Sequence, residues 1–468
     1  MTATRVSRAV TRRPERTLGA RVGFDQAVRT AAGSVLWLSL LLVTYWWVAD
    51  NGLQDMAHLT DSMTSAGRIS GLVASVLLLA QVVLMARVPV LERAFGQDRL
   101  ARIHRTVGFT SFNLMLLHIV TITLGYGAMQ VTAVPATLWD LTVDYPGMLL
   151  AAAGTACLVM VVVTSVKAAR RRLRYESWHL MHLYAYLGVG LALPHQLWTG
   201  QQFTDSPAKT VFWWSAWALA AAAVLVWRLG VPLMVNLRHR LRVVAVVDEG
   251  AGVRTVVVTG RRLDALSAEA GQFFTWRFLT GAGWTRGNPY SLSAAPDGQS
   301  LRFTVRDVGD GSRRTRGLRP GTRVIVEGPY GRLTSRPRTR PRLAFIGAGV
   351  GITPLRALAE GLSYAPGDAI YVERFTDTPL FAAEIDDLST RRGLQVLRVP
   401  GRRRSPDSWL GPIVGTASDL TALRRWIPDV ADRDVYVCGP EPWTDLVCAT
   451  LTAAGLPDER LHLETFAW

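Results

Sequence analysis

One apolar stretch constrains the chain more than any other, because it is long enough to cross a lipid bilayer and carries two histidines. It runs from Arg102 to Tyr126, and its histidines, His104 and His118, are 14 residues apart. A helix rises about 1.5 Å and turns about 100° per residue, so the two rings would lie roughly 21 Å apart and within about 40° of one face. Ionisable groups inside a membrane are costly, so this pattern indicates a functional role.

A second apolar stretch, residues 178–198, carries His182 and His195 at nearly the same separation. Two helices with imidazoles at matching heights predict two flat metal cofactors, and haem is the flat cofactor that takes two axial imidazoles. On an ideal helix, the 13 residues between His182 and His195 would place the two rings about 140° apart around the axis. Pro194 removes a backbone donor directly before His195, and the resulting distortion can bring that ring round. His179, one turn before His182, is a rival ligand.

Apolar runs fill most of the first half of the chain, which is 49% hydrophobic overall. Six runs lie at 33–49, 68–86, 105–126, 147–166, 179–198 and 210–236. Each approaches the roughly 20 residues that a bilayer core requires, so we expect a six-helix transmembrane bundle over residues 33–236.

Basic residues gather in alternate connections, which predicts the orientation of the bundle. They follow the second, fourth and sixth runs: Arg87, Arg93, Arg99, Arg102 and Arg105; Lys167, Arg170, Arg171, Arg172 and Arg174; Arg238, Arg240 and Arg242. The first connection has no Lys or Arg before Arg68, the third connection has none, and the fifth has only Lys209. Both termini are therefore expected in the cytoplasm, at a multi-pass cell membrane.

This orientation assigns the histidines to levels. The third and fifth runs both cross outward, so His104 pairs with His182 near the inner face and His118 with His195 near the outer face. We expect one haem b at each level. The net charge of +16 would then face anionic lipid rather than nucleic acid.

Two further features bear on the termini and on redox state. Residues 1–32 contain seven arginines and no long apolar run, so we expect a basic cytoplasmic arm rather than a cleaved signal. Cys157, Cys438 and Cys448 fit no disulfide framework or zinc spacing.

The composition changes after residue 236. Between residues 237 and 336, short β-rich runs alternate with glycines, which predicts an antiparallel β-barrel. From 337 to 468, strand-like and helical runs alternate, which predicts a parallel α/β nucleotide-binding domain. The expected fold is a multidomain membrane protein with a helical bundle, a β-barrel and an α/β domain.

Three motifs in this half predict phosphate binding. IGAGVGITP (346–354) is a glycine-rich turn between strand and helix, where the backbone can approach a pyrophosphate. NPYSLSAAP (288–296) and VRDVGDGS (305–312) offer backbone and hydroxyl groups to a second phosphorylated cofactor.

The ordered set of motifs resembles a known family. The matching elements are the four histidines with PYSLS, GQFF, GDGS, EGPYG, GAGVGITP, VCGPEP and the terminal HLETFAW. The tail from about 238 resembles ferredoxin–NADP⁺ reductases. The chain from about 33 to its end resembles the bacterial form of the ferric reductase and NADPH oxidase superfamily.

The resemblance implies cofactor-binding residues for FAD and for a nicotinamide dinucleotide. For FAD they are Asn288, Pro289, Tyr290, Ser291, Gly309, Gly311 and Ser312, with the isoalloxazine near Tyr290 and Ser291. For the dinucleotide they are Gly347, Gly349, Gly351, Thr353 and Gly439. The family usually has arginine or histidine where this chain has Asn288, and Arg286 is the candidate substitute.

The resemblance also implies catalytic residues. Cys438 would lie beside the nicotinamide, and Glu464 would complete the hydride-transfer site. Phe466 would shield the flavin until nicotinamide displaces it, or Trp468 would take that role. Arg68 would face a haem propionate or a developing anion such as superoxide, or it is an interfacial arginine that reaches the headgroups.

Arginines favour NADPH over NADH, because the adenosine 2′-phosphate is dianionic. Arg374 follows the second strand of the terminal sheet, and Arg402, Arg403 and Arg404 follow the third. Glu373 is the acidic residue nearby.

Together these features predict an oxidoreductase that passes electrons from cytosolic NADPH through FAD and two b-type haems to an extracytoplasmic acceptor. The acceptor is dioxygen or ferric iron: the outer connections have only the isolated His58 as an iron ligand, whereas Ile122 replaces a histidine of animal NADPH oxidases. The alternatives are a haem-containing reductase that feeds a protein partner, and a histidine-relay proton channel with a nucleotide-sensing tail.

Overall fold

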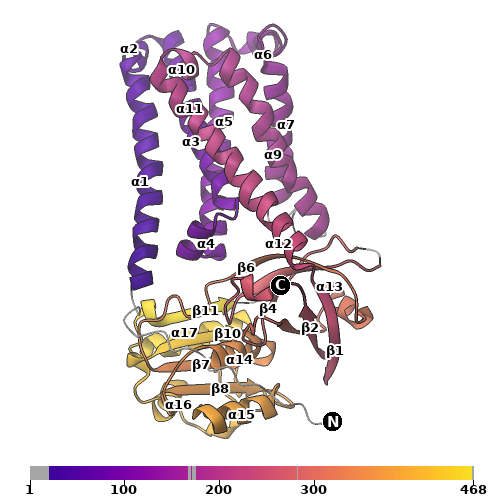
Figure 1. Cartoon of the computed structure of the whole chain (residues 1–468). Helices are drawn as coiled ribbons and strands as arrows, with labels where there is room; N and C mark the ends of the chain where they lie inside the picture. Colours follow the sequence, from indigo (N-terminus) through magenta and orange to yellow (C-terminus); the bar gives the residue numbers. More distant parts are fainter. Residues whose placement is uncertain (1–19, 167–169, 171–174, 282, 466–468) are drawn as a thin grey trace. The chain divides into compact units, whose positions relative to one another are not determined.

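The computed structural model describes residues 20–166, 170, 175–281 and 283–465 (Figure 1). These residues form two compact units. One comprises Ala27–Val231, and the other combines the described residues before Ala27 with those from Pro232 onward.

Long helices build the first unit. They are α1 (Ala20–Ala49), α3 (Leu59–Met85), α5 (Gln97–Tyr126), α7 (Met148–Ser165), α9 (Tyr175–Trp198) and α11 (Pro207–Ala223), which continues through a π-helical segment (Val224–Gly230) into α12 (Val231–His239). Short helices occupy the connections: α2 (Gly52–Asp55), α4 (Pro89–Phe95), α6 (Val134–Val143) and α10 (Gln201–Thr204). Figure 1 shows α2, α6 and α10 at one end of the bundle and α4 at the other, so α5 and α9 run in the same direction.

Five helices among the described residues are long and apolar enough to cross a membrane. They cover Val22–Ala49, Asp61–Met85, Gln97–Tyr126, Met148–Ser165 and Pro207–His239. The fifth predicted run lies in α9, which is not one of the five. This helix contains three histidines, Pro194 and Gln196.

The first helix begins earlier than the predicted boundary at residue 33. Helix α1 starts at Ala20, because the segment from there to residue 32 contains no proline to stop it. The remainder of the predicted arm, residues 1–19, lies outside the described residues.

Glycines bring the helices of the bundle together in two pairs. Where α3 packs on α5, a Cβ added at Gly71 would lie 2.6 Å from Nδ1 of His118. Where α7 packs on α9, a Cβ at Gly154 would lie 2.7 Å from the carbonyl oxygen of Gly188. Small residues allow such close approach in membranes. Within the described ranges, α5 and α9 share no comparable interface.

The second unit begins with two three-stranded antiparallel sheets. The first has the order β1 (Arg242–Gly250), β2 (Val253–Thr259), β5 (Ser300–Arg306), and the second β4 (Asn288–Ser291), β3 (Phe273–Phe278), β6 (Val324–Tyr330). Alternate side chains of both sheets, such as Phe274, Trp276 and Phe303, fill one core. The antiparallel strands expected here are therefore present, arranged as two sheets.

A five-stranded parallel sheet follows, as predicted. Its order is β11 (Leu461–Thr465), β10 (Asp434–Gly439), β7 (Leu343–Ala348), β8 (Ala369–Phe375), β9 (Gln395–Pro400). The helices of this part are α14 (Ile352–Gly361), α15 (Ala382–Arg392), α16 (Asp419–Trp426) and α17 (Glu441–Ala453). The central strands β7 and β10 are buried along their whole length, which is why they read as continuous apolar runs.

Candidate functional site

His104 of α5 and His182 of α9 lie together at the level nearer α4. The rings of His104 and His182 have centroids 6.1 Å apart, with their planes at 69°. Nδ1 of His182 lies 3.3 Å from Oγ of Ser165, which also accepts a hydrogen bond from the indole of Trp178. His179 interacts electrostatically with His182, but the ring that contacts His104 is that of His182.

At the other level, His118 and His195 are close enough to interact electrostatically. Nδ1 of His118 lies 2.7 Å from the carbonyl oxygen of Gly67, so a neutral ring donates there and keeps Nε2 as its acceptor. Helix α9 continues through Pro194. Gly147 packs directly on the backbone beyond it, since an added Cβ would lie 2.7 Å from the nitrogen of His195.

A buried amide holds α9 beside the pair of His118 and His195. Nε2 of Gln196 donates to Oγ of Ser75 on α3 at 3.3 Å, and its Oε1 accepts from Nε1 of Trp217 on α11 at 3.2 Å. The sequence analysis did not identify Gln196. The sequence feature that could have pointed to Gln196 is a single amide beside a histidine in an apolar stretch, where an unsatisfied polar group is costly.

The paired imidazoles fit a haem. Two nitrogens that each bind one metal at about 2.0 Å are about 4 Å apart, and the 6.1 Å between the ring centroids of His104 and His182 is compatible with that spacing. In the part of the chain that the structure describes, no three or more His, Cys, Asp or Glu side chains gather as a metal cluster. Two ligands per level suit a cofactor that supplies its own in-plane nitrogens.

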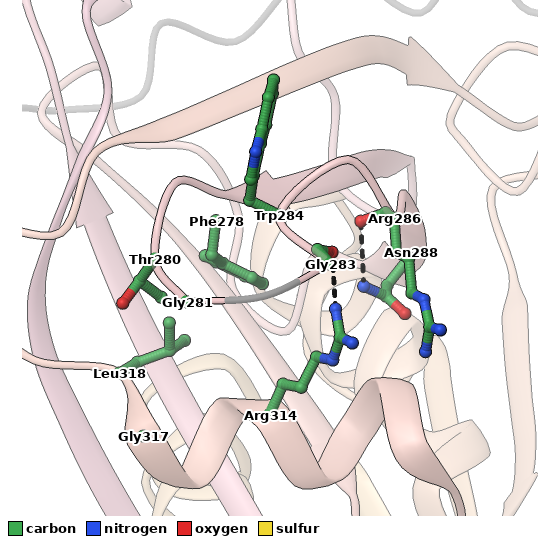
Figure 2. Close-up of a pocket in the computed structure, with 10 residues that line it drawn as sticks. All are labelled: Phe278, Thr280, Gly281, Gly283, Trp284, Arg286, Asn288, Arg314, Gly317 and Leu318. Carbon is green, nitrogen blue, oxygen red and sulfur yellow. Dashed lines mark hydrogen bonds between the residues drawn. The ribbon is translucent and has the colours of Figure 1, made fainter.

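A cavity of about 260 Å³ lies beside β4, and Figure 2 shows the residues that line it. Its lining residues are Phe278, Thr280, Gly281, Gly283, Trp284, Arg286, Asn288, Arg314, Gly317 and Leu318. Nη1 of Arg314 donates to the carbonyl oxygen of Gly283 at 2.5 Å, and Nδ2 of Asn288 donates to that of Arg286 at 3.4 Å. Arg314 was not identified from the sequence, because it follows the GDGS motif rather than belonging to it.

Two predicted flavin motifs meet at this cavity. An added Cβ at Gly311 would meet Oδ1 of Asn288, so the two loops lie close together and the Asn288 side chain would have to move for a larger residue. Oγ of Ser312 accepts from the backbone N–H of Gly309 at 3.1 Å and so orders the turn. The ring of Tyr290 is buried and stacks on Phe303 with centroids 5.2 Å apart, and burial raises the pKa of its hydroxyl.

The glycine-rich turn after β7 lies against the end of β10. Gly349 has a φ of +56°, a backbone conformation that favours glycine. A Cβ at Gly351 would lie 2.5 Å from the carbonyl oxygen of Cys438. Thr353 donates to the carbonyl oxygen of Val350 at 2.9 Å and closes the turn at the start of α14.

Cys438 and Glu464 are register partners on the adjacent parallel strands β10 and β11. The thiol is fully buried, and burial together with the Glu464 carboxylate raises its pKa well above the usual value. Cys438 therefore stays protonated at neutral pH. The neighbouring Gly439 packs against the Trp443 ring, where an added Cβ would lie 2.7 Å from Cε3. Phe466 and Trp468 lie outside the described residues.

The arginines predicted to select NADPH separate into different roles. Arg374 donates to the carbonyl oxygen of Gly401 at 3.0 Å, and burial and the nearby charge of Arg403 lower its pKa. Arg404 instead forms an ion pair with Asp419 at 2.8 Å, and Arg402 is exposed.

Glu373 lies below this surface. It is 1% exposed and accepts a hydrogen bond from the backbone N–H of Leu380 at 3.1 Å. Its carboxyl is therefore directed into the protein and not toward a ribose hydroxyl.

Comparison with known proteins adds family information for both halves. Residues 70–193 match the family described as ferric reductase like transmembrane component. The ferredoxin reductase component of 3-ketosteroid-9-alpha-monooxygenase from Mycolicibacterium smegmatis is 30% identical over 240 residues, 48% of this chain and 65% of that protein. The glycine betaine monooxygenase reductase subunit of Pseudomonas aeruginosa is 26% identical over 242 residues, 49% of this chain and 65% of that protein. The solved FAD/NAD-binding domain of nitric oxide dioxygenase from Vibrio cholerae is 25% identical, with 49% of this chain and 99% of that chain covered and a TM-score of 0.38.

The chain has the fused architecture of the ferric reductase and NADPH oxidase superfamily. Its second half resembles the FAD and NAD(P)H modules of ferredoxin reductases and follows a stretch that resembles a ferric reductase transmembrane component. The chain spans just under two thirds of the length of the curated relatives named above.

Ile122, which stands where animal NADPH oxidases have a histidine, and Arg68 and His58 are the residues that bear on the predicted acceptor. The side chain of Ile122 fills the space at Gly67, where an added Cβ would lie 2.6 Å from Cγ1 of Ile122. Arg68 is 3.6 Å from the carboxylate of Asp55, and its side chain is 40% exposed. His58 is exposed at the start of α3.

Replacing Glu373 with glutamine should remove a pH dependence of stability. Burial raises the pKa of Glu373 to about 7, from 4.5 for the free side chain. The folded protein therefore binds a proton that the unfolded chain releases, so this stabilisation is full below about pH 4.5 and is lost as the pH rises through about 7. We expect Glu373→Gln to match the wild type near pH 5 and to be more stable at pH 8 by up to about 3 kcal/mol, measured by thermal unfolding of the full chain. A stability difference that stays constant over this pH range would contradict the assignment.

Proposed function

We propose that the chain passes electrons from cytosolic NADPH through FAD and two b-type haems to dioxygen or ferric iron on the other side of the membrane. The observation that carries this proposal is the two-level pairing of histidines on α5 and α9. His104 faces His182 at 6.1 Å between ring centroids, and His118 lies near His195 more than three helical turns away.

The proposed topology has six spans, with α9 as the sixth membrane helix beside the five apolar ones. A polar helix is tolerated in a membrane when its polar groups face the bundle interior and are satisfied there. The contacts of the buried Gln196 with Ser75 and Trp217 are of this kind. The basic connections then place both termini in the cytoplasm.

The histidines would hold haem iron, which supplies one-electron chemistry when bound. The chain's own contribution is to fix the rings. Gly67 accepts the Nδ1 proton of His118, which orients Nε2 toward a metal, and such backbone partners typically orient ligating histidines.

For FAD we propose the cavity of Figure 2 as the phosphate site. Arg314 and Arg286 line this cavity and bring positive charge to it. Arg314 thereby takes over part of the role that the family gives to the residue at position 288.

Replacing Arg314 with alanine should weaken FAD binding by about tenfold or more, the value of one charge-assisted hydrogen bond to a phosphate. Fluorescence titration of the FAD-depleted protein measures this. Arg316→Ala is the matched control, because Arg316 belongs to the same turn but forms an ion pair with Asp307. Equal loss of affinity in both variants would argue against a direct contact with the phosphate.

For the nicotinamide nucleotide we propose NADPH. Arg374 and Arg403 bring two like charges together at the end of β8, an arrangement that a dianionic 2′-phosphate would stabilise. The dinucleotide would lie along the turn of Gly347, Gly349 and Gly351, with Thr353 and Gly439 at its border, and its nicotinamide near Cys438 and Glu464.

Reversing the charge at Arg403 should therefore raise the KM for NADPH at least tenfold and leave the KM for NADH nearly unchanged. Steady-state kinetics with both nucleotides measures the ratio. The neighbouring exposed Arg402 provides the control, and Arg402→Glu should alter neither the KM for NADPH nor the KM for NADH by more than a small factor. If Arg403→Glu affects both nucleotides equally, the pair does not recognise the 2′-phosphate.

A vesicle assay tests the function as a whole. Purified chain is reconstituted into lipid vesicles with NADPH outside, and a ferrous-iron chelator with ferric citrate, or a superoxide probe, is trapped inside. We expect NADPH oxidation to reduce a trapped acceptor, and whether ferrous iron or superoxide forms identifies the class of natural electron acceptor. Reduction only on the NADPH side of the membrane would contradict the proposal.

A second candidate is a membrane reductase that feeds a protein partner. It is favoured by the relatives, which are named as reductase components or subunits of monooxygenases. This function predicts that neither small acceptor is reduced in the vesicle assay, although NADPH still reduces the flavin.

A further inference from the structure

Three charged residues from three different elements form one ionic cluster, which we call the clasp. Arg302 lies on β5, Arg356 on α14 and Glu384 on α15. Arg302 makes a two-pronged pair with Glu384, both bonds at 2.9 Å, and Nη2 of Arg356 lies 2.7 Å from Oε2 of the same carboxylate. The clasp therefore joins the antiparallel sheets to the helices of the parallel sheet.

The clasp also binds the backbone directly after the NPYS strand. Arg302 donates to the carbonyl oxygen of Ser293 at 2.8 Å, and Arg356 donates to the same oxygen at 3.2 Å. Ser293 is fully buried and lies two residues beyond Ser291, in the motif proposed to hold the flavin. Movement of either arginine would thus be felt at that motif.

The same network fixes the C-terminal half of helix α14. Arg356 also pairs with Glu360 at 2.5 Å, and Glu360 accepts from the backbone N–H of Ala295 at 2.8 Å. Gly361 packs against the antiparallel part so closely that an added Cβ would lie 2.7 Å from that of Ala270. Because a ten-residue helix is a rigid rod of about 15 Å, fixing its C-terminal half also fixes the glycine turn at its start.

The charges of the clasp are matched and poorly solvated. The Arg356 side chain is 8% exposed and that of Arg302 is 18% exposed. Burial alone would raise the pKa of Glu384, but its hydrogen bonds to Arg302 and the charges of both arginines lower it, so the carboxylate stays ionised. Paired charges in such surroundings impose geometry more than they add stability.

We propose that the clasp is a positioning device that sets the distance between the flavin motif and the dinucleotide turn for hydride transfer. The inference rests on the proposed roles of these two motifs and adds residues that contact neither cofactor. Because hydride transfer depends steeply on the separation of donor and acceptor, a small shift should slow it strongly. Nucleotide binding should change little, because a shift of α14 as a rigid rod moves the turn without changing the geometry inside the turn.

The test is anaerobic stopped-flow reduction of the flavin by NADPH in the full-length protein. For Glu384→Gln we expect the limiting rate of flavin reduction to fall about tenfold or more, with an NADPH dissociation constant within about twofold of the wild type. Glu384→Asp, which keeps the charge, should recover part of the rate. Asp387→Asn is the matched control, because Asp387 pairs with Arg391 on the exposed face of the same helix and should leave the rate unchanged.

The outcomes separate the inference from the proposed function. A Glu384→Gln protein with lower thermal stability but an unchanged limiting rate would show that the clasp only stabilises the fold, and would overturn the inference alone. A wild-type protein whose flavin NADPH does not reduce would overturn the proposed function itself. Should Glu384→Gln fail to retain flavin, Arg302→Lys replaces it with the same expectations, because lysine keeps the charge but not the two-pronged geometry.

Discussion

The close packing of α3 on α5 and of α7 on α9 determines where the four imidazole rings lie. In an apolar bundle no hydrophobic force selects one helix arrangement over another, so contact between small residues and a few hydrogen bonds must do so. Gly71 allows His118 to lie against α3, and the carbonyl of Gly67 orients its ring. Bulkier residues at these glycines would separate the helices and move the rings.

The second unit uses the same device in a different setting. Gly311 lets the GDGS turn contact Asn288, and Gly351 lets the dinucleotide turn contact the end of β10. Arginines have a different place at each of these two turns. Arg314 lines the cavity proposed for FAD, whereas the clasp of Arg302, Arg356 and Glu384 joins the two halves of the unit. Close backbone approach creates the sites, and arginines connect them.

Local pattern predicted much of this arrangement. The spacing of His104 and His118 and the glycine turn at 346–354 depend on periodicity and backbone geometry, which a sequence displays directly. The strands of both sheet systems follow the predicted apolar runs for the same reason. Family resemblance, rather than pattern, supplied the roles expected for Cys438 and Glu464.

The rest depended on partners far away in the chain. Gln196 is satisfied by Ser75 and Trp217, and Arg404 is bound by Asp419, so neither role can be read from neighbouring residues. Helix α9 is not among the helices apolar enough to cross a membrane, and its three histidines and Gln196 are the polar residues that lower its hydropathy. The start of α1 at Ala20 was missed because arginines are good helix formers, whereas the prediction treated them as the mark of an arm.

The central claim is that paired histidines on α5 and α9 hold two haems. The most direct measurement is the reduced-minus-oxidised absorbance spectrum of the purified chain, with haem quantified per polypeptide. The account predicts bis-imidazole b-type absorbance with two haems per chain, and one haem after His118 or His195 is replaced by leucine. A wild-type chain without b-type absorbance, or an unchanged haem content in both variants, would contradict it.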